Sequence, residues 1–222
     1  MIKICGLATP ETLEAALTAG ADMVGFVRFP RSPRHVELPL ARDLSQQAAG
    51  RAQRVVLLVD PSDAELDEAL AALDPDLVQL HGRETPERAR IVRERAGRPV
   101  MKAIGVATAD DLAALKRYAG AVDRFLLDAK PPAGARLPGG NGVAFDWRLL
   151  SGAALGPDDM VSGGLTPENV AEAIVVSGAC GVDVSSGVES RPGEKDPVRI
   201  AAFVRAARDA FAERGRVAKR ER

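Results

Sequence analysis

Short runs of β-branched and aliphatic residues alternate along the chain with longer segments in which apolar residues recur every three or four positions. The first pattern predicts buried strands and the second predicts amphipathic helices. Successive strand candidates start roughly 21 to 35 residues apart, the length that one strand, one helix and two loops require. The eight candidates are residues 2–5, 23–26, 55–59, 77–80, 100–103, 125–127, 160–161 and 181–184.

The helical segments carry recognisable start signals. Thr9-Pro10 supplies a capping hydroxyl and a first-turn proline, and the pattern Thr-Pro-Glu recurs at Thr85 and Thr166. One stretch rich in proline and glycine, residues 130–142, is the longest loop-like insertion and follows the sixth strand candidate. Further helices are predicted over residues 62–73 and 197–213.

Eight such units without an evident linker predict a single α/β domain. We expect a (β/α)8 TIM barrel with a parallel eight-stranded core over residues 1–213, followed by a charged tail, residues 214–222, that frays. The alternative is an open doubly wound sheet. That fold would carry the pattern G-x-G-x-x-G after the first strand, and residues 5–10 do not match it.

Composition and charge limit which partners and which cellular location we expect. A net charge of −1 gives no reason to expect nucleic acid or an anionic membrane as partner, although a nucleic-acid role for the basic tail is an alternative. Two cysteines are too few for a disulfide framework, and the start lacks the apolar stretch of a signal peptide. We therefore expect a cytoplasmic monomer or homodimer that acts on a small molecule.

Several polar residues follow strand candidates, where the active-site rim of a barrel would lie. Cys5 ends the first strand and is a candidate base or nucleophile, or else a buried spacer. Asp128 ends the sixth strand and is placed for proton transfer, or for a helix cap or an ion pair. Three further candidates, each with a plain structural alternative, are Arg34, His81 and Asp183.

Two glycine-rich turns, residues 162–165 and 185–188, follow the seventh and eighth strand candidates. Barrels that bind phosphorylated substrates hold the phosphate in these two loops, because glycine lets backbone N–H groups approach an anion. Residues 139–142 are a candidate third wall. The sequence shows no metal-ligand spacing, no P-loop and no nucleophile elbow.

Taken together, these residues resemble the phosphoribosylanthranilate isomerase family of tryptophan biosynthesis. The matching segments occur in order along the chain, from Lys-Ile-Cys-Gly-Leu at residues 3–7 to Lys-Asp at residues 195–196. The others are residues 19–22, 24–26, 32–34, 78–82, 127–128, 142, 145–147, 163–165, 167–170, 182–189 and 193.

The resemblance implies an Amadori rearrangement that needs no metal and no organic cofactor. It implies that Asp128 is the general acid, that Cys5 is the general base and that Arg34 binds the anthranilate carboxylate. Asp183 would contact sugar hydroxyls, and His81 matches a motif position without an assigned task. The phosphate would lie on Gly142, Gly163, Gly164, Ser185 and Ser186.

Two positions depart from the family pattern: Asn141 stands where Thr or Ser is frequent, and Arg83 where an acidic residue is common. Strand alternation also puts Lys3 on the face of Cys5, and we hypothesise that Lys3 helps the thiolate to form. The alternatives are indole-glycerol-phosphate synthase, a histidine-pathway isomerase, and a catalytically silent barrel that binds a phosphorylated ligand.

Overall fold

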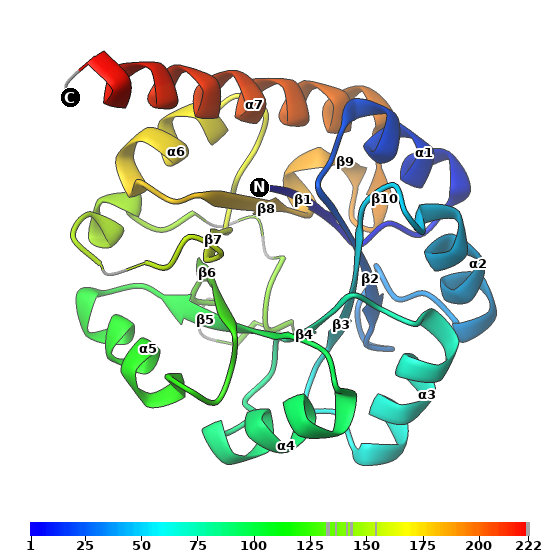
Figure 1. Ribbon diagram of the computed structural model, residues 1–222. Coiled ribbons are helices and arrows are strands. Elements are labelled where there is room, and N and C mark those ends of the chain that lie inside the picture. Colours follow the sequence, from blue (N-terminus) through cyan, green and yellow to red (C-terminus); the bar gives the residue numbers. More distant parts are fainter. Residues whose placement is uncertain (132–133, 136, 141, 143, 154, 221–222) are drawn as a thin grey trace.

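The computed structural model describes residues 1–220 apart from 132, 133, 136, 141, 143 and 154. Its eight main strands form a closed barrel in chain order, with every neighbouring pair parallel. Helices surround this barrel (Figure 1), and the predicted (β/α)8 fold is confirmed. The strands are β1 (Ile2–Cys5), β2 (Met23–Arg28), β3 (Gln53–Leu58), β4 (Leu77–Leu80), β5 (Val100–Val106), β6 (Arg124–Ala129), β7 (Met160–Val161) and β8 (Gly181–Val184).

Predicted and observed strand bounds agree at both ends for β1, β4, β7 and β8. The other four strands include polar or glycine residues that an apolar run does not reveal. Gln53 belongs to β3 because it pairs with Met23, and Gly105 belongs to β5 because it pairs with Asp128. Closure of the barrel thus recruits residues into strands whatever their hydropathy.

The helices follow most of the predicted starts. Thr9 and Thr85 cap their helices through side-chain oxygens that accept from the third residue on. The predicted start at Thr166 is wrong, because residues 167–169 form a turn in which the Asn169 side chain accepts from Thr166 N. The α-helices are α1 (Pro10–Ala19), α2 (Leu38–Ala48), α3 (Asp63–Leu73), α4 (Pro86–Ala96), α5 (Ala113–Tyr118), α6 (Val170–Ser177) and α7 (Pro197–Arg220).

The connection from β6 to β7 departs from the regular pattern. Its described residues contain only the short 3₁₀ helix η2 (Trp147–Leu150), where a full helix was expected. A 3₁₀ helix η1 (Ala109–Leu112) precedes α5. After β8 come the 3₁₀ helix η3 (Ser186–Val188) and a small hairpin of β9 (Glu189–Arg191) and β10 (Glu194–Lys195), which was not predicted.

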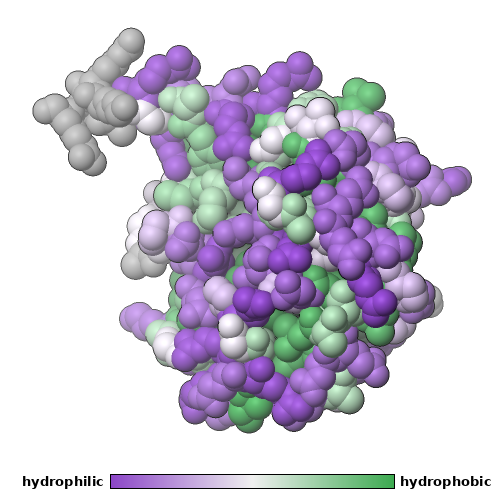
Figure 2. Space-filling view, turned by 45° about the vertical axis from the view of Figure 1, so that its right-hand side comes forward, coloured by the Kyte–Doolittle hydropathy of each residue, from purple (hydrophilic) through white to green (hydrophobic). Residues whose placement is uncertain are grey.

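Helix α7 packs against both α1 and α6, across the barrel wall where β8 meets β1 (Figure 1). It continues to Arg220, beyond the predicted end at residue 213, while fraying of the tail stays a prediction. Hydrophilic residues cover most of the face shown in Figure 2. None of the described helices has both the length and the apolar character that a membrane span requires.

The interior divides into layers. An apolar cluster fills the lumen toward the amino ends of the strands, and its larger members are Met23, Val55, Leu77, Met101, Leu126 and Met160. A second and larger cluster joins the outer faces of the strands to the helices, with Phe26 and Phe203 among its fully buried members. Because apolar side chains fill the lumen toward the amino ends of the strands, the polar groups of a site are expected at the carboxyl ends.

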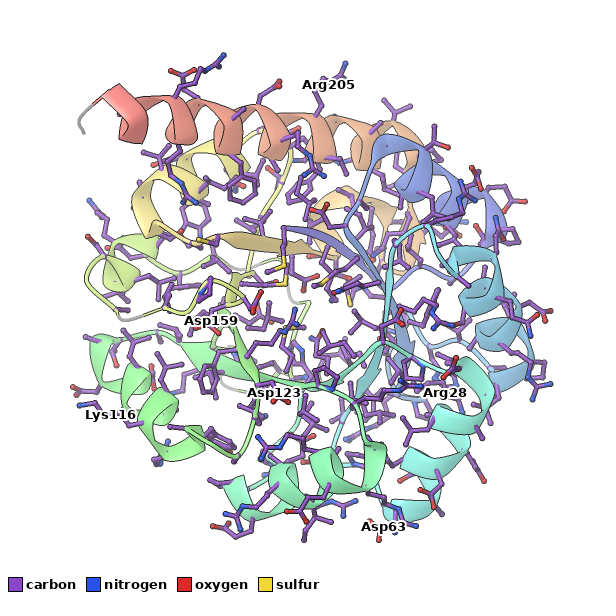
Figure 3. The ribbon with its side chains drawn as sticks, viewed as in Figure 1. Arg28, Asp63, Lys116, Asp123, Asp159 and Arg205 are labelled. Carbon is purple, nitrogen blue, oxygen red and sulfur yellow. The ribbon has the colours of Figure 1, made fainter. Side chains whose placement is uncertain are left out.

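At the amino ends, three aspartates repeat one arrangement that we call the base clamps. Each stands just before an even-numbered strand, and its carboxylate accepts from a backbone N–H of the preceding strand, at Ile2 for Asp22 and at Val100 for Asp123. Each also donates its own N–H to the carbonyl of the same residue. The third clamp joins Asp76 to Arg54. Figure 3 labels Asp123 with Asp159, which accepts from Phe125 N in a related way.

Candidate active site

One pocket opens among the loops at the carboxyl ends of the strands, with an empty volume of about 790 Å³ that includes open solvent. Elements from across the chain contribute to it, from β1 to η3. It gathers all ten residues proposed from the sequence: Cys5, Arg34, His81, Asp128, Gly142, Gly163, Gly164, Asp183, Ser185 and Ser186. Asn141, the departure noted in the sequence, lies outside the described residues.

Cys5 lies beside a buried ion pair. Lys3, fully enclosed, donates through Nζ to Asp183 Oδ1 at 2.8 Å. The neighbouring strand leaves room for this group at Gly25, where a Cβ would lie 3.0 Å from the Cys5 sulfur and 3.3 Å from Lys3 Cε. Lys3 and Cys5 therefore share the lumen face, as strand alternation predicted.

Electrostatics at Cys5 pull in two directions. Burial raises the pKa of the Cys5 thiol, the charge of Lys3 lowers it, and burial has the larger effect. Burial is the largest single effect on Lys3 and disfavours its charged form, but the charges of Asp183 and Cys5 and the hydrogen bonds with both together outweigh burial, and the pKa of Lys3 is raised. The charge of Lys3 thus acts in the direction that the hypothesis requires, while burial keeps the pKa of the Cys5 thiol above its ordinary value.

Asp128 is held from two sides at the end of β6. The backbone N–H of Ala129 donates to its Oδ1 at 2.8 Å, and His81 Nε2 lies 3.2 Å from its Oδ2. The turn after β7 passes close by, at Gly163, whose φ of +82° suits glycine and where a Cβ would lie 3.0 Å from Asp128 Oδ1. His81 therefore has a direct partner in the proposed acid.

Arg34 is buried and already bound along one edge. Its Nε and Nη2 donate to the two carboxylate oxygens of Glu189 at 2.7 and 2.9 Å, which is a bidentate pair. Glu189 also accepts from Lys195 Nζ at 2.6 Å. Burial pushes the pKa of Glu189 upward, but the hydrogen bond from Arg34 and the charge of Lys195 prevail and lower it. The carboxylate stays ionised and fixes the guanidinium plane.

The loop from β6 to β7 lies against the same guanidinium. Gly140 accepts weakly from Arg34 Nη2 at 3.3 Å, and a Cβ on Gly140 would stand 2.5 Å from Nη1. Only a residue without a side chain fits there. The third wall that the sequence predicted at residues 139–142 thus contacts Arg34 through Gly140.

The turn after β8 is tied to the rest of the site. Ser185 donates its hydroxyl proton to the Cys5 carbonyl at 3.1 Å and accepts from Lys195 Nζ at 3.1 Å. Its single proton is therefore already engaged, which leaves backbone groups for an anion at this residue. Burial lowers the pKa of Lys195 against the opposing effect of Glu189. Ser186 begins η3 at the pocket wall.

Four residues of this site received no role from the sequence: Gln79, Ser162, Glu189 and Lys195. Gln79 stands two residues before His81, and a glutamine inside a buried strand was the available signal. Glu189 and Lys195 lie within segments that carried the family resemblance, but nothing in their spacing showed that they meet Arg34. Among the described residues, no group of three or more His, Cys, Asp or Glu side chains is arranged to hold a metal ion.

Comparisons with known proteins agree with this geometry. The family model for N-(5'-phosphoribosyl)anthranilate (PRA) isomerase matches residues 2–206. An N-(5'-phosphoribosyl)anthranilate isomerase from Rhodopseudomonas palustris (strain HaA2) is 62% identical over 208 residues, covering 94% of this chain and 95% of the relative.

Solved structures show the same likeness. The crystal structure of phosphoribosylanthranilate isomerase from Thermotoga maritima has a TM-score of 0.83 at 35% identity, covering 94% of this chain and 98% of that one. Another structure of such an isomerase, with reduced 1-(o-carboxyphenylamino)-1-deoxyribulose 5-phosphate bound, has a TM-score of 0.80 at 34% identity, with the same coverage of both chains.

Proposed function

The chain belongs to the N-(5'-phosphoribosyl)anthranilate isomerase family, and we propose that Cys5 and Asp128 are the base and the acid of its reaction. The reaction is the Amadori rearrangement of N-(5-phosphoribosyl)anthranilate to 1-(2-carboxyphenylamino)-1-deoxyribulose 5-phosphate, an aldose–ketose isomerisation in tryptophan biosynthesis. The observation that carries the assignment is that Cys5 on β1 and Asp128 on β6 line one pocket.

Asp128 acts first in this scheme. It gives a proton to the ribose ring oxygen, the C1′–O bond breaks, and the nitrogen lone pair forms a protonated Schiff base. The Cys5 thiolate then removes the C2′ proton, and the electron pair moves to form an enolamine. Tautomerisation gives the ketone, and the protons taken up balance those released because substrate and product are isomers. Since the two groups stand on different strands, each can reach its own part of the sugar.

The raised pKa of Cys5 bears on the second step. A raised pKa favours the thiol form of Cys5, and that proton must leave before Cys5 can act as a base. Lys3 stands on the same face and offsets part of the cost of a buried thiolate. Its bond to Asp183 keeps the ammonium group in place.

The remaining contacts let us assign each part of the substrate to residues of the pocket. Because Glu189 occupies the Nε–Nη2 edge of Arg34, we assign the anthranilate carboxylate to Nη1. We assign the sugar hydroxyls to Asp183. The phosphate is assigned to the two glycine turns, at Gly142, Gly163, Gly164, Ser185 and Ser186, mainly through backbone groups at Ser185.

A fluorescence assay on freshly formed phosphoribosylanthranilate tests the proposal. We expect the purified protein to consume the substrate, and Cys5→Ser to leave at most about one hundredth of the turnover. A wild-type protein without turnover would reject the function, whereas an active Cys5→Ser variant would reject only the role of Cys5. We further propose a cytoplasmic monomer or homodimer, which sedimentation of the purified protein tests for its oligomeric part.

A further inference from the structure

Gln79 occupies a position in the lumen that the proposed mechanism leaves without a task. It lies in β4, fully buried, and its side chain lines the active-site pocket. Its amide nitrogen stands 2.9 Å from His81 Nδ1. The other amide atom, Oε1, has no hydrogen-bond partner within the described part of the chain, although it is buried. A buried polar atom without a partner is costly in a folded protein and calls for a reason.

The contacts of His81 define its protonation in this arrangement. An amide nitrogen donates, so Nδ1 must accept and the ring proton must sit on Nε2. Nε2–H then lies 3.2 Å from Asp128 Oδ2, and Ala129 N–H donates to the other oxygen. One oxygen of Asp128 thus accepts a hydrogen bond and the other lies close to a protonated ring nitrogen, which suits an ionised carboxylate. The arrangement therefore describes the acid after it has given up its proton.

Protonated Asp128 requires the opposite tautomer of the His81 ring. When Asp128 carries its proton on Oδ2, that proton is donated to His81 Nε2, and the ring proton must then reside on Nδ1. Nδ1–H needs an acceptor, and the unpaired Oε1 of Gln79 becomes that acceptor when the amide turns about its last bond. The amide is the one side-chain group that offers a donor and an acceptor of nearly equal size at the same distance.

We propose that Gln79 is a positioning residue whose amide turns with the state of the acid, donating to His81 when Asp128 is ionised and accepting from it when Asp128 is protonated. His81 then stays neutral and hydrogen-bonded to both forms of Asp128. This inference rests on the proposed role of Asp128. One proton is taken up from solvent between the two forms, and it is the proton later given to the ring oxygen.

The charged groups near Gln79 and His81 have partners of their own or belong to the proposed reaction. Charged groups of the loop after β4 are already engaged, because Lys102 donates to Glu84 and Asp60 accepts from the backbone N–H of Arg83. Gly139 lies against His81 and Asp128: a Cβ there would lie 2.3 Å from His81 Nε2 and 2.9 Å from Asp128 Oδ2. The other titratable or charged residues of the pocket lining are Cys5, Asp183, which pairs with Lys3, Arg34, which pairs with Glu189, and Lys130, which pairs with Asp111.

The ring nitrogens can be observed directly. The chain has two histidines, so in the variant His35→Gln all imidazole signals of ¹⁵N-labelled protein belong to His81. At high pH we expect a proton on Nε2 alone, and at low pH a proton on Nδ1 alone, with the change following the alkaline limb of kcat/KM. A ring with a proton on Nε2 alone at every pH at which the protein is folded, or with protons on both nitrogens at low pH, would overturn the proposal, and this readout does not depend on turnover.

Variants of Gln79 test the same idea through activity. Glu at this position can only accept when ionised, so Gln79→Glu favours Nδ1–H and should move the alkaline limb of kcat/KM upward by about one pH unit. Gln79→Met offers neither bond and should lower kcat by about tenfold with little change in KM. Gln46→Glu, which adds the same charge on the exposed side of α2, is the matched control.

Two outcomes would contradict Gln79 in this role. One is an alkaline limb of kcat/KM that falls at the same pH in Gln79→Glu as in Gln46→Glu. The other is a His81 ring whose tautomer is the same in Gln79→Glu and in the protein with Gln79 intact. If Gln79→Met does not fold, the nitrogen shifts and the Glu variant still decide. Loss of wild-type turnover would instead reject the proposed function and leave the tautomer result standing.

Discussion

Two buried lysine–carboxylate pairs lie on opposite sides of the barrel wall. Lys3 pairs with Asp183 inside the lumen at 2.8 Å, and Lys102 pairs with Glu84 outside it, between strand and helix, at 2.9 Å. All four side chains are almost fully buried. The two pairs have similar distances but different neighbours, since the Cys5 thiol stands beside the first pair, and loop backbone and the Tyr118 ring stand beside the second.

The outer pair has a scaffolding task. Glu84 accepts from the backbone N–H groups of Asp60 and Gly82, and Lys102 also donates to the Gly82 carbonyl. Together they fix the loop that carries His81. The comparison shows that burial and pairing alone do not mark a functional charge. What marks Lys3 is that its charge acts on a titratable group that lines the active-site pocket, whereas the titratable neighbour of the second pair, Tyr118, lies outside that pocket.

Replacing each lysine in turn is expected to have the largest effect and tests the difference between the two pairs directly. Lys3→Met and Lys102→Met each leave a buried carboxylate without its partner, so we expect a loss of about 3–5 kcal/mol in the free energy of unfolding for both. Urea unfolding measures this loss. Only Lys3→Met should also shift Cys5, because removal of its charge raises the thiol pKa further.

The shift is measured as the rate of Cys5 alkylation against pH. Cys180 is exposed and would react too, so both variants belong in a Cys180→Ser background. We expect the Lys3→Met curve to move to higher pH and the Lys102→Met curve to follow that of the parent protein. Superimposed curves for Lys3→Met and the parent would show that Lys3 does not act on the thiol.

Removing the proposed acid or the proposed base tests the catalytic role of the lumen side directly. Cys5→Ala and Asp128→Ala should each lower kcat by at least about a hundredfold, the usual loss when general acid–base catalysis is removed. Neither leaves a buried charge without its ion-pair partner, so their unfolding midpoints should stay much nearer the wild type than those of the lysine variants. Steady-state turnover and urea midpoints check the two statements, and near-normal turnover in either variant would refute that residue's role.

Arg34 lies on the pocket side as well, but its role is binding. Arg34→Met should mainly raise KM, by roughly ten- to a hundredfold, because a charge-assisted contact to the carboxylate is lost. Arg191→Met is the matched control, since Arg191 is exposed and pairs with Glu194 on the same hairpin. An unchanged KM for Arg34→Met, or an equal rise in the control, would argue against the assignment.

The smallest effect concerns an exposed carboxylate far from the reactive thiol. The hydrogen bond from Lys130 holds the pKa of Asp111 at about 2, below its ordinary 3.8. A lowered pKa stabilises the fold above the unfolded value, so this contribution is present above about pH 4 and is lost as the pH falls toward 2. Asp111→Asn should reduce the fall in urea midpoint between pH 5 and pH 3 slightly, and an equal fall would contradict the pairing.

Much of the barrel could be predicted because its strands are apolar and two of its helices, α1 and α4, begin with threonine–proline caps. Cys5 and Asp128 were found because each stands at the end of a strand run. The partners of Arg34 and His81 were not, since Glu189 lies 155 residues from Arg34 in the chain and they meet only when the barrel closes. The missing helix after β6 was not predicted either, because a glycine-rich insertion hides where regular structure resumes.

The base clamps divide the barrel into modules of two strands. They join β1 to β2, β3 to β4 and β5 to β6 in one repeated way. In the last module the register puts Cys180 where the clamping aspartate would stand. Each module contributes a different part of the proposed reaction: the base from the first, His81 from the second, the acid from the third and Asp183 from the fourth. Each clamp lies within one pair of strands, whereas the proposed chemistry needs groups from all four pairs and arises only when they close around a common axis.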